Sequence, residues 1–231
     1  MKLEHAPVPA LRPSEYSAAL IQVLQWNTQR IKGASVVDVG SGSGIVLASL
    51  AVMGARILCG VDIEQAAVDV GTKLMHELGY ADRSEFLKGD MWQPLAERRF
   101  DVVAANLPHF PMEEAAEVAG RLPTWSAGGA DGRRLLDRFL DGLPRHLSAN
   151  GKAVITHNGF VGVERTREIV ARSGLALKVA KTEWIYIADE KLDLMTDSVL
   201  LAEDGRSIHR YGPYTFGEMH IVEIGTPGAL A

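Results

Sequence analysis

Apolar residues in this chain fall into short continuous runs that alternate with amphipathic stretches, from residue 35 to about residue 187. Continuous apolar runs of about four to eight residues are typical of strands buried on both faces, as in a parallel sheet covered by helices. The runs that predict such strands are 35–39, 56–62, 84–90, 99–106 and 151–158. The alternation therefore predicts an α/β fold with a parallel sheet.

Stretches with helical periodicity separate these runs, and a further one precedes the first strand. The predicted helices are 14–31, 45–54, 64–79, 132–147 and 163–174. Ser14 is a suitable residue to cap the first of them, because its hydroxyl can accept a hydrogen bond from a free N–H of the first turn.

The C-terminal part departs from the alternation. Residues 177–188 and 218–225 have the pattern of a closing pair of strands, which we expect to be antiparallel. The stretch between them, 189–217, is predicted to be a long loop, and connections of that length are often functional. The chain, 1–231, is expected to form a single domain of seven strands, with 1–34 as a helical lead-in.

The composition supports a globular protein and narrows its partners. The 231 residues are 47% hydrophobic and 23% charged, which is ordinary for a folded domain. The formal net charge of −5 gives no global basic field that would attract nucleic acid. The N-terminus lacks the apolar core of a signal peptide, and no apolar stretch is long enough to cross a bilayer. We therefore expect a cytoplasmic protein with no membrane contact.

A glycine-rich turn follows the first predicted strand and reads Asp38-Val-Gly40-Ser41-Gly42-Ser-Gly44. Glycines allow a sharp turn and a close approach to a ligand, while the next helix offers free N–H groups at its start. A dinucleotide fingerprint would require a third glycine at position 45, where this chain has Ile. The spacing therefore disfavours a hydride-transferring dehydrogenase.

The Gly-x-Gly-x-Gly spacing, with an acid two residues before it, resembles the S-adenosylmethionine loop of class I methyltransferases. The resemblance implies that Asp62, at the end of the second strand, binds the ribose hydroxyls, and that Asp90 and Met91 hold the adenine. Asp38 faces the methionine end of the cofactor or orients the glycine loop; the sequence leaves both open. The residues assigned to the cofactor are Asp38, Gly40, Ser41, Gly42, Gly44, Asp62, Ile63, Asp90, Met91 and Asn106.

The fourth predicted strand ends in the segment "NLPHFP", residues 106–111. It resembles the Asn-Pro-Pro-Tyr motif of methyltransferases that modify planar nitrogens. In that motif the Asn side-chain oxygen and the backbone carbonyl of the next residue accept hydrogen bonds from the substrate's N–H groups. The aromatic ring stacks on the plane of the substrate. Carried over, the catalytic residues are Asn106, Leu107, Pro108 and His109, and the substrate-binding residues are Asn106, His109 and Phe110, with Trp125 as a further contact.

Three segments together resemble the HemK-type release-factor glutamine methyltransferases: 11–20, 106–111 and 126–140. The resemblance implies a Rossmann-like, seven-stranded α/β sheet, mostly parallel with an antiparallel last strand and helices on both faces. The chain departs from the family at Leu107 and His109. We also expect it to lack the N-terminal helical domain that docks protein substrates in bacterial members, because the chain leaves no room for that domain.

The resemblance makes an S-adenosylmethionine-dependent N-methyltransferase, acting on a planar amide or amine, the leading interpretation. The missing docking domain and the acidic charge favour a small-molecule acceptor. A protein glutamine amide is the alternative, a nucleic-acid base ranks third, and a cofactor-binding partner subunit is the non-enzyme alternative. His109 could stack on the acceptor or take its proton, and stacking is preferred. No histidine spacing predicts a metal site.

Overall fold

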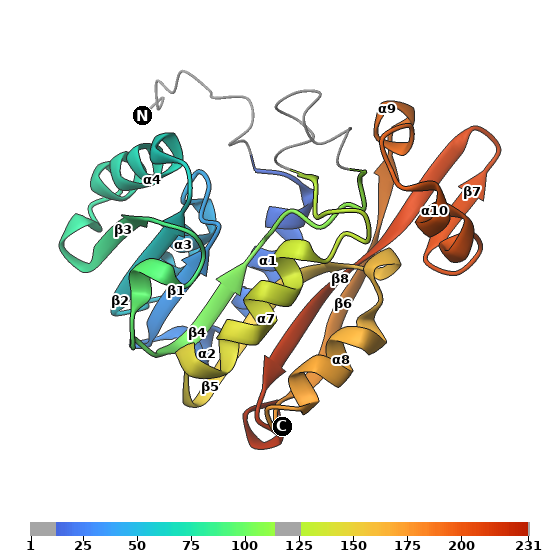
Figure 1. Cartoon of the computed structure of the whole chain (residues 1–231). Helices are drawn as coiled ribbons and strands as arrows, with labels where there is room; N and C mark the ends of the chain where they lie inside the picture. The colour runs from blue at the N-terminus through green and yellow to red at the C-terminus, as the bar shows by residue number, and fades with distance from the viewer. Residues whose placement is uncertain (1–12, 114–125, 231) are drawn as a thin grey trace.

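The computed structural model describes residues 13–113 and 126–230, whose centre is a twisted sheet of eight strands (Figure 1). Their order in the sheet is β3-β2-β1-β4-β5-β8-β6, and β7 pairs with β8. The strands are β1 (Ser35–Val39), β2 (Ile57–Asp62), β3 (Ser84–Lys88), β4 (Phe100–Ala105), β5 (Leu147–Asn158), β6 (Ala176–Ile187), β7 (Ile208–Tyr211) and β8 (Tyr214–Gly225).

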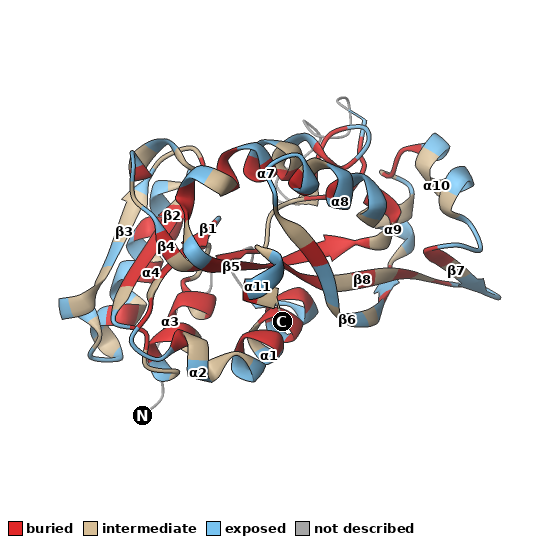
Figure 2. Ribbon diagram, turned by 90° about the horizontal axis from the view of Figure 1, so that it is seen from below, coloured by how far each residue is buried: buried red, intermediate tan, exposed pale blue. Residues whose placement is uncertain are grey.

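The first five strands pair in parallel, and β8 is antiparallel to both β5 and β6. The predicted α/β class and the mostly parallel sheet with an antiparallel end are therefore confirmed, with one strand more than the seven expected. Val37 and Val103, which face each other in the middle of the sheet, are fully buried. Figure 2 shows the middle strands largely buried, whereas β3 and β7 at the two ends are partly exposed.

Helices cover both faces of this sheet. In Figure 2, α1 and α3 lie on one side of the middle strands and α7 and α8 on the other. The helices are α1 (Glu15–Trp26), α2 (Thr28–Ile31), α3 (Ile45–Val52), α4 (Gln65–Glu77), α7 (Arg134–His146), α8 (Val163–Ala171), α9 (Asp189–Leu192), α10 (Asp197–Glu203) and α11 (Pro227–Leu230). Among the described residues, no helix is both long and apolar enough to span a bilayer.

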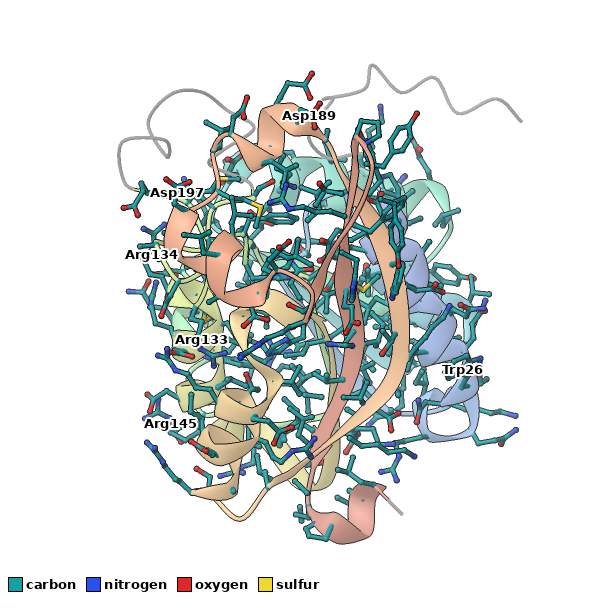
Figure 3. All side chains as sticks on the ribbon, turned by 90° about the vertical axis from the view of Figure 1, so that its right-hand side faces the viewer. Trp26, Arg133, Arg134, Arg145, Asp189 and Asp197 are labelled. Atoms are coloured by element: carbon teal, nitrogen blue, oxygen red, sulfur yellow. The ribbon has the colours of Figure 1, made fainter. Side chains whose placement is uncertain are left out.

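The helix that the sequence predicts over 14–31 forms as α1 and α2, with a break of one residue at Asn27 between them. The Asn27 amide donates to Glu223 Oε1 at 2.8 Å and accepts from Lys152 Nζ at 3.1 Å. Lys152 and Glu223 form a buried ion pair, 3.3 Å apart, on the neighbouring strands β5 and β8. Asn27 completes the hydrogen bonding of this pair at the point where the helix is broken. Trp26, just before the break, remains 60% exposed (Figure 3).

The stretch 189–217 is not the loop that the sequence predicts: it contains α9, α10 and β7. Asp189 and Asp197 each stand at the first position of a helix (Figure 3), where an acid interacts favourably with the helix dipole. The stretch is also attached to the chain after β4, since the N–H of Thr196 donates to the carbonyl of Pro111 at 2.9 Å. It therefore forms part of the wall beside residues 106–112.

We expect Gly44→Ala to destabilise the protein more than Gly79→Ala, which serves as its matched control. Both glycines have a φ of +77°, but a Cβ at Gly44 would lie 2.9 Å from Gly71 Cα, while a Cβ at Gly79 meets nothing within 4 Å. Gly79→Ala should cost about 1–2 kcal/mol for the left-handed backbone alone. Gly44→Ala should cost roughly 1–3 kcal/mol more, because the added atom overpacks the core. Urea unfolding would measure both, and equal losses would contradict the packing argument.

Candidate active site

A cavity of about 580 Å³ opens at the carboxyl ends of β1, β2 and β4. Ligands of open α/β sheets bind at this edge, and the volume lies within the usual range for small-molecule and cofactor sites. Its lining includes every residue that the sequence assigns to the cofactor except one: Asp38, Gly40, Ser41, Gly42, Asp62, Ile63, Asp90, Met91 and Asn106. The exception is Gly44, which stands at the start of α3 and packs against Gly71 and Phe86.

The glycine loop forms the floor of this cavity in a left-handed backbone. Gly40 and Gly42 have φ values of +74° and +50°. The N–H groups of Gly40 and Ser41 donate to the carbonyl of Val61 at 2.8 and 3.0 Å, so the loop is fixed to the end of β2. The buried Ser41 hydroxyl has no hydrogen-bond partner among the described residues. Because buried polar groups are normally paired, this hydroxyl fits a polar group of a bound ligand.

Asp62 links the glycine loop to the start of the next helix. Its Oδ2 accepts from the Gly42 N–H at 2.8 Å and its Oδ1 from the Glu64 N–H at 2.9 Å. Each carboxylate oxygen can accept more than one hydrogen bond, so both stay able to bind a diol. Ile63 beside it is 64% exposed at the rim of the cavity and offers an apolar surface. These features fit the ribose and the adenine of the predicted cofactor.

Asp90 is paired with Arg138, a residue of α7 that the sequence did not suggest. The Arg138 guanidinium donates to Asp90 Oδ2 at 2.6 Å, and both side chains are about half exposed. Met91, at a φ of +54°, is buried at 8% exposure and lines the same cavity. An adenine amine at this place would share Asp90 with Arg138.

Asp38 lies at the bottom of the cavity with 2% of its surface exposed. Burial, and secondly the negative charge of Asp62, raises the pKa of Asp38 to about 8. The carboxyl is therefore mostly protonated at pH 7 in the protein without ligand. A cationic ligand would stabilise its ionised form, as an opposite charge lowers the pKa of a carboxyl group.

The affinity for S-adenosylmethionine should therefore depend on pH through Asp38. If the ionised carboxylate binds the positive end of the cofactor, binding below pH 8 must release a proton. The affinity should then rise with pH, by at most about tenfold per unit, and level off above the pKa. Calorimetry in buffers of different ionisation enthalpy would measure the proton release, and Asp38→Asn should abolish it. A flat affinity between pH 6 and 8, with no proton released, would contradict this role.

Asn106 stands at the end of β4, at the wall shared by two cavities. The hydroxyl of Thr156, which is buried on β5, donates to Asn106 Oδ1 at 2.9 Å and fixes the amide. A second cavity of about 210 Å³ adjoins the first. It is lined by Ser14, Glu15, Tyr16, Asn106, Leu107, Pro108, His109, Phe110, Ser126 and Lys191. The residues 106–108 line both cavities, as a site for transfer between two ligands requires.

His109 is buried and contacts its own backbone turn. Its Nδ1 hydrogen-bonds the carbonyl oxygen of Leu107, and Tyr16 packs edge-on at a ring separation of 5.7 Å. Burial lowers the pKa of His109 to about 4. The imidazole is thus neutral near pH 7, so its Nδ1–H donates to Leu107. A carbonyl oxygen has two lone pairs, so Leu107 can still accept a bond from a substrate.

We expect His109→Phe to keep most of the activity, with a loss of less than about tenfold. A neutral ring packed against Tyr16 serves as a wall, which phenylalanine can replace. Since the pKa of His109 lies at about 4, its titration produces no break in the wild-type rate between pH 5.5 and 7.5. A wild-type pH profile would test this. A break near pH 6.5 that vanishes in the variant, together with a larger loss, would indicate a general base instead.

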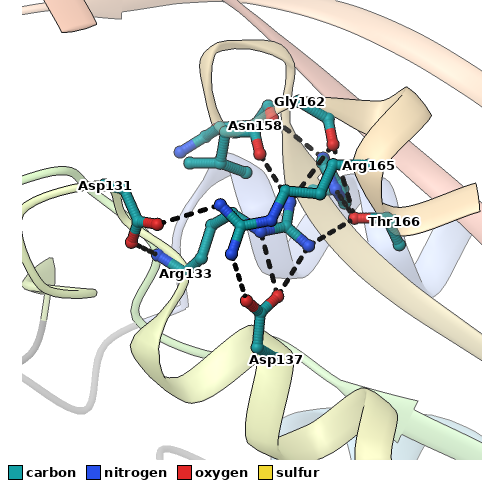
Figure 4. A network of polar contacts seen from close by, with 9 residues as sticks. Asp131, Arg133, Asp137, Asn158, Gly162, Arg165 and Thr166 are labelled. Atoms are coloured by element: carbon teal, nitrogen blue, oxygen red, sulfur yellow. Dashed lines mark hydrogen bonds and ion pairs between the residues drawn. The ribbon is translucent and has the colours of Figure 1, made fainter. Parts of the chain in front are cut away.

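A buried arginine, Arg133, links the segment 126–140 to the start of α8 (Figure 4). The Arg133 guanidinium, 2% exposed, donates to Asp137 at 2.9 Å and to Thr166 Oγ1 at 3.0 Å. The start of this segment pairs with the motif, because the Phe110 N–H donates to the Ser126 carbonyl at 2.8 Å. Trp125, the further substrate contact that the sequence predicts, lies outside the described residues.

No group of three or more metal-binding side chains occurs within 13–113 and 126–230. The residues that sequence reasoning missed are Thr156, Arg138 and Lys191. Thr156 and Lys191 reach the site from β5 and α9, far from the motifs in the chain. Arg138 lies within the segment 126–140, on the helix that follows its glycines, and no local pattern shows that it pairs with Asp90.

Comparisons with known proteins find similar sequences among methyltransferases. Residues 36–124 match a family model described as a methyltransferase domain. A relative from Methanocaldococcus jannaschii, "Putative protein N5-glutamine methyltransferase MJ0928", is 29% identical over 73% of this chain and 82% of its own length. A release factor glutamine methyltransferase of Gloeobacter violaceus is 32% identical over 61% of this chain. The chain spans about half (51%) of the length of that second relative.

A solved structure shares the fold at low sequence identity. The crystal structure of a "putative RNA methyltransferase PH1948" from Pyrococcus horikoshii superposes with a TM-score of 0.62 and 17% identity. The match covers 98% of this chain and 90% of that one. At such identity the likeness supports the fold alone.

Proposed function

We propose that this chain, as a class I S-adenosylmethionine-dependent methyltransferase, methylates the side-chain amide nitrogen of glutamine. Its similarity to the HemK-type enzymes is the premise of the proposal. The observation that carries the proposal is the position of Asn106. Its amide is fixed by Thr156 at the end of β4 and lines both the large cavity and the smaller one beside it.

The residues of the large cavity fit the cofactor. Asp62 would hold the ribose, Ile63 and Met91 would pack against the adenine, and Ser41 and Asp38 would face the polar methionine end. When bound, S-adenosylmethionine supplies an electrophilic methyl group on a sulfonium. In-line transfer from such a group needs an acceptor that is held in place and kept away from water.

Two hydrogen-bond acceptors of the chain would position the substrate. Asn106 Oδ1 and the carbonyl of Leu107 would each accept a hydrogen bond from one of the two N–H groups of a planar amide. Thr156 donates to Asn106 Oδ1 and fixes the direction of that amide. His109 donates to the carbonyl of Leu107. A planar amide bound in this way would present its nitrogen to the large cavity. The N–C bond would form as the S–C bond of the sulfonium breaks, which leaves S-adenosylhomocysteine, and the amide would release one N–H proton to the solvent.

The relatives favour a protein acceptor over the small molecule that the sequence suggests. MJ0928 and the release factor enzyme are both named for glutamine methylation, the first explicitly in a protein. The preference for a small molecule is not supported by these relatives. A glutamine side chain within a polypeptide is therefore the acceptor that we propose.

Three matched peptides, which differ only in a central Gln, Asn or Glu, would test the proposal. With S-adenosylmethionine carrying a deuterated methyl group, mass spectrometry should show one added methyl on the Gln peptide. The Asn peptide, shorter by one methylene, should react at least about tenfold more slowly because its amide does not reach Asn106. The Glu peptide should not react. Equal labelling of all three peptides would contradict the proposal.

A further inference from the structure

The ammonium group of Lys191, which belongs neither to the glycine loop nor to the "NLPHFP" segment, lies in the wall of the second cavity. Lys191 lies on α9, in the stretch between β6 and β8, and lines the cavity together with the motif residues. Its Nζ lies 3.4 Å from the centre of the Phe110 ring, a cation–π contact. Phe110 belongs to the "NLPHFP" segment, so the ammonium stands close to the place where the acceptor amide would bind.

The position of Lys191 is fixed by the backbone around it. Met112 and Met195 form an isolated antiparallel bridge, and the Thr196 N–H donates to the Pro111 carbonyl at 2.9 Å. The chain that follows α9 is thereby paired with the chain that follows the motif. Lys191 is thus part of the cavity wall and not a side chain of a separate surface loop.

Most other polar groups of this wall are engaged or solvated, and the exception is the buried Nε2 of His109, which has no hydrogen-bond partner among the described residues. Tyr16 donates its hydroxyl to Asn158 Oδ1 at 2.8 Å, and His109 donates to Leu107. Glu15 lies at the exposed rim, where water screens its charge. Apart from the Phe110 ring, the Lys191 ammonium contacts no hydrogen-bond or ion-pair partner among the described residues. Burial lowers the pKa of Lys191 to about 8, which the charge of Glu15 partly opposes.

We propose that the second cavity binds the methyl acceptor and that Lys191 binds a carboxylate which the acceptor carries close to its amide. A partly buried ammonium is stabilised by an anionic partner with which it can hydrogen-bond. The same ammonium would repel a cationic amine. The inference rests on the proposed function and deepens it, because it specifies which glutamines are suitable. The carboxylate could be an acidic side chain next to the glutamine, or the main-chain carboxylate of a C-terminal or free glutamine.

Two pairs of matched probes would test this inference and identify the source. N-acetylglutamine and its neutral methylamide differ in the main-chain carboxylate. Peptides containing Gln-Glu and Gln-Gln differ in the side-chain carboxylate. Binding to the full chain in the presence of S-adenosylhomocysteine would be measured by calorimetry, for the wild type, Lys191→Met and Lys191→Arg. Lys178→Met is the matched control, because Lys178 is an exposed lysine of β6 that does not line the cavity.

The wild type should bind the anionic member of at least one pair about tenfold or more tightly than its neutral partner. That preference should vanish in Lys191→Met and remain in Lys191→Arg and Lys178→Met. The pair that shows the preference identifies the source of the carboxylate. No preference in the wild type, no binding, or an unchanged preference in Lys191→Met would overturn the inference. Methyl transfer to the neutral probes in that case would leave the proposed function standing.

Discussion

Replacing Asn106 by Ala is expected to lower methyl-transfer turnover by about a hundredfold or more, while the affinity for the cofactor stays within a few-fold. The side chain accepts a bond from Thr156 and stands between the two cavities, so its loss leaves the acceptor unoriented. Misplacement of a reacting group by about an ångström can cost roughly a hundredfold. Single-turnover rates with saturating cofactor would measure the effect.

Two further variants make this result specific. Asn150→Ala removes an exposed asparagine that does not line either cavity, and it should leave turnover unchanged. Thr156→Val removes the hydroxyl that holds the amide but keeps the shape of the side chain, so it should give a smaller loss, about tenfold. Near-normal turnover of Asn106→Ala would show that the "NLPHFP" segment does not position the acceptor.

Asp62→Ala is expected to weaken binding of S-adenosylmethionine and of its demethylated product by about 2–3 kcal/mol, or roughly 30- to 160-fold. The substitution removes a charged acceptor for hydroxyl groups. It also frees the N–H groups of Gly42 and Glu64, which fix the glycine loop. Both effects lower affinity in the same direction.

Calorimetry with both ligands would measure this loss, and circular dichroism would show whether the variant remains folded. Asp82→Ala, at an exposed aspartate that does not line the cavity, is the matched control and should bind normally. An unchanged affinity of Asp62→Ala, or binding of NAD by the wild type, would show that this cavity does not bind the predicted cofactor.

The sequence predicts the parallel part of the sheet because each of its strands has a distinct hydrophobic pattern over a few consecutive residues. The strands β1, β2 and β4 are continuous apolar runs, and a sheet covered on both faces requires such runs. The break in the first helix at Asn27 could not be predicted, since the Asn27 side chain binds an ion pair between Lys152 and Glu223, more than a hundred residues away. Long-range polar contacts leave no trace in helical periodicity.

The β7–β8 hairpin was missed although a local signal exists. Tyr211 pairs with Tyr214 across the two residues Gly212 and Pro213, and Gly212 has a φ of +60°. A glycine at the first central position is typical of a two-residue hairpin turn. β7 has only four residues, Ile208–Tyr211, and β8 begins at Tyr214, four residues before the strand that the sequence predicts at 218–225. So short a strand is not distinguished from a loop by its hydrophobic pattern.

The candidate site likewise contains residues that the sequence predicts and residues that it does not. The glycine loop, Asp62 and the "NLPHFP" segment are consecutive patterns at strand ends, so the sequence alone places them at one edge of the sheet. Gly44 belongs to the same pattern but acts through packing against α4, which spacing does not reveal. Thr156 and Lys191 enter the site from β5 and α9. Only the folded arrangement brings them to the motif.

The position of the transferred methyl group tests the central claim most directly. A Gln peptide labelled with ¹⁵N at its side-chain amide would be incubated with the protein and S-adenosylmethionine whose methyl carbon is ¹³C. If the amide nitrogen accepts the methyl, the ¹³C resonance of the product will show a one-bond coupling to ¹⁵N. A methyl resonance without that coupling, which places the methyl on another atom, would contradict the account.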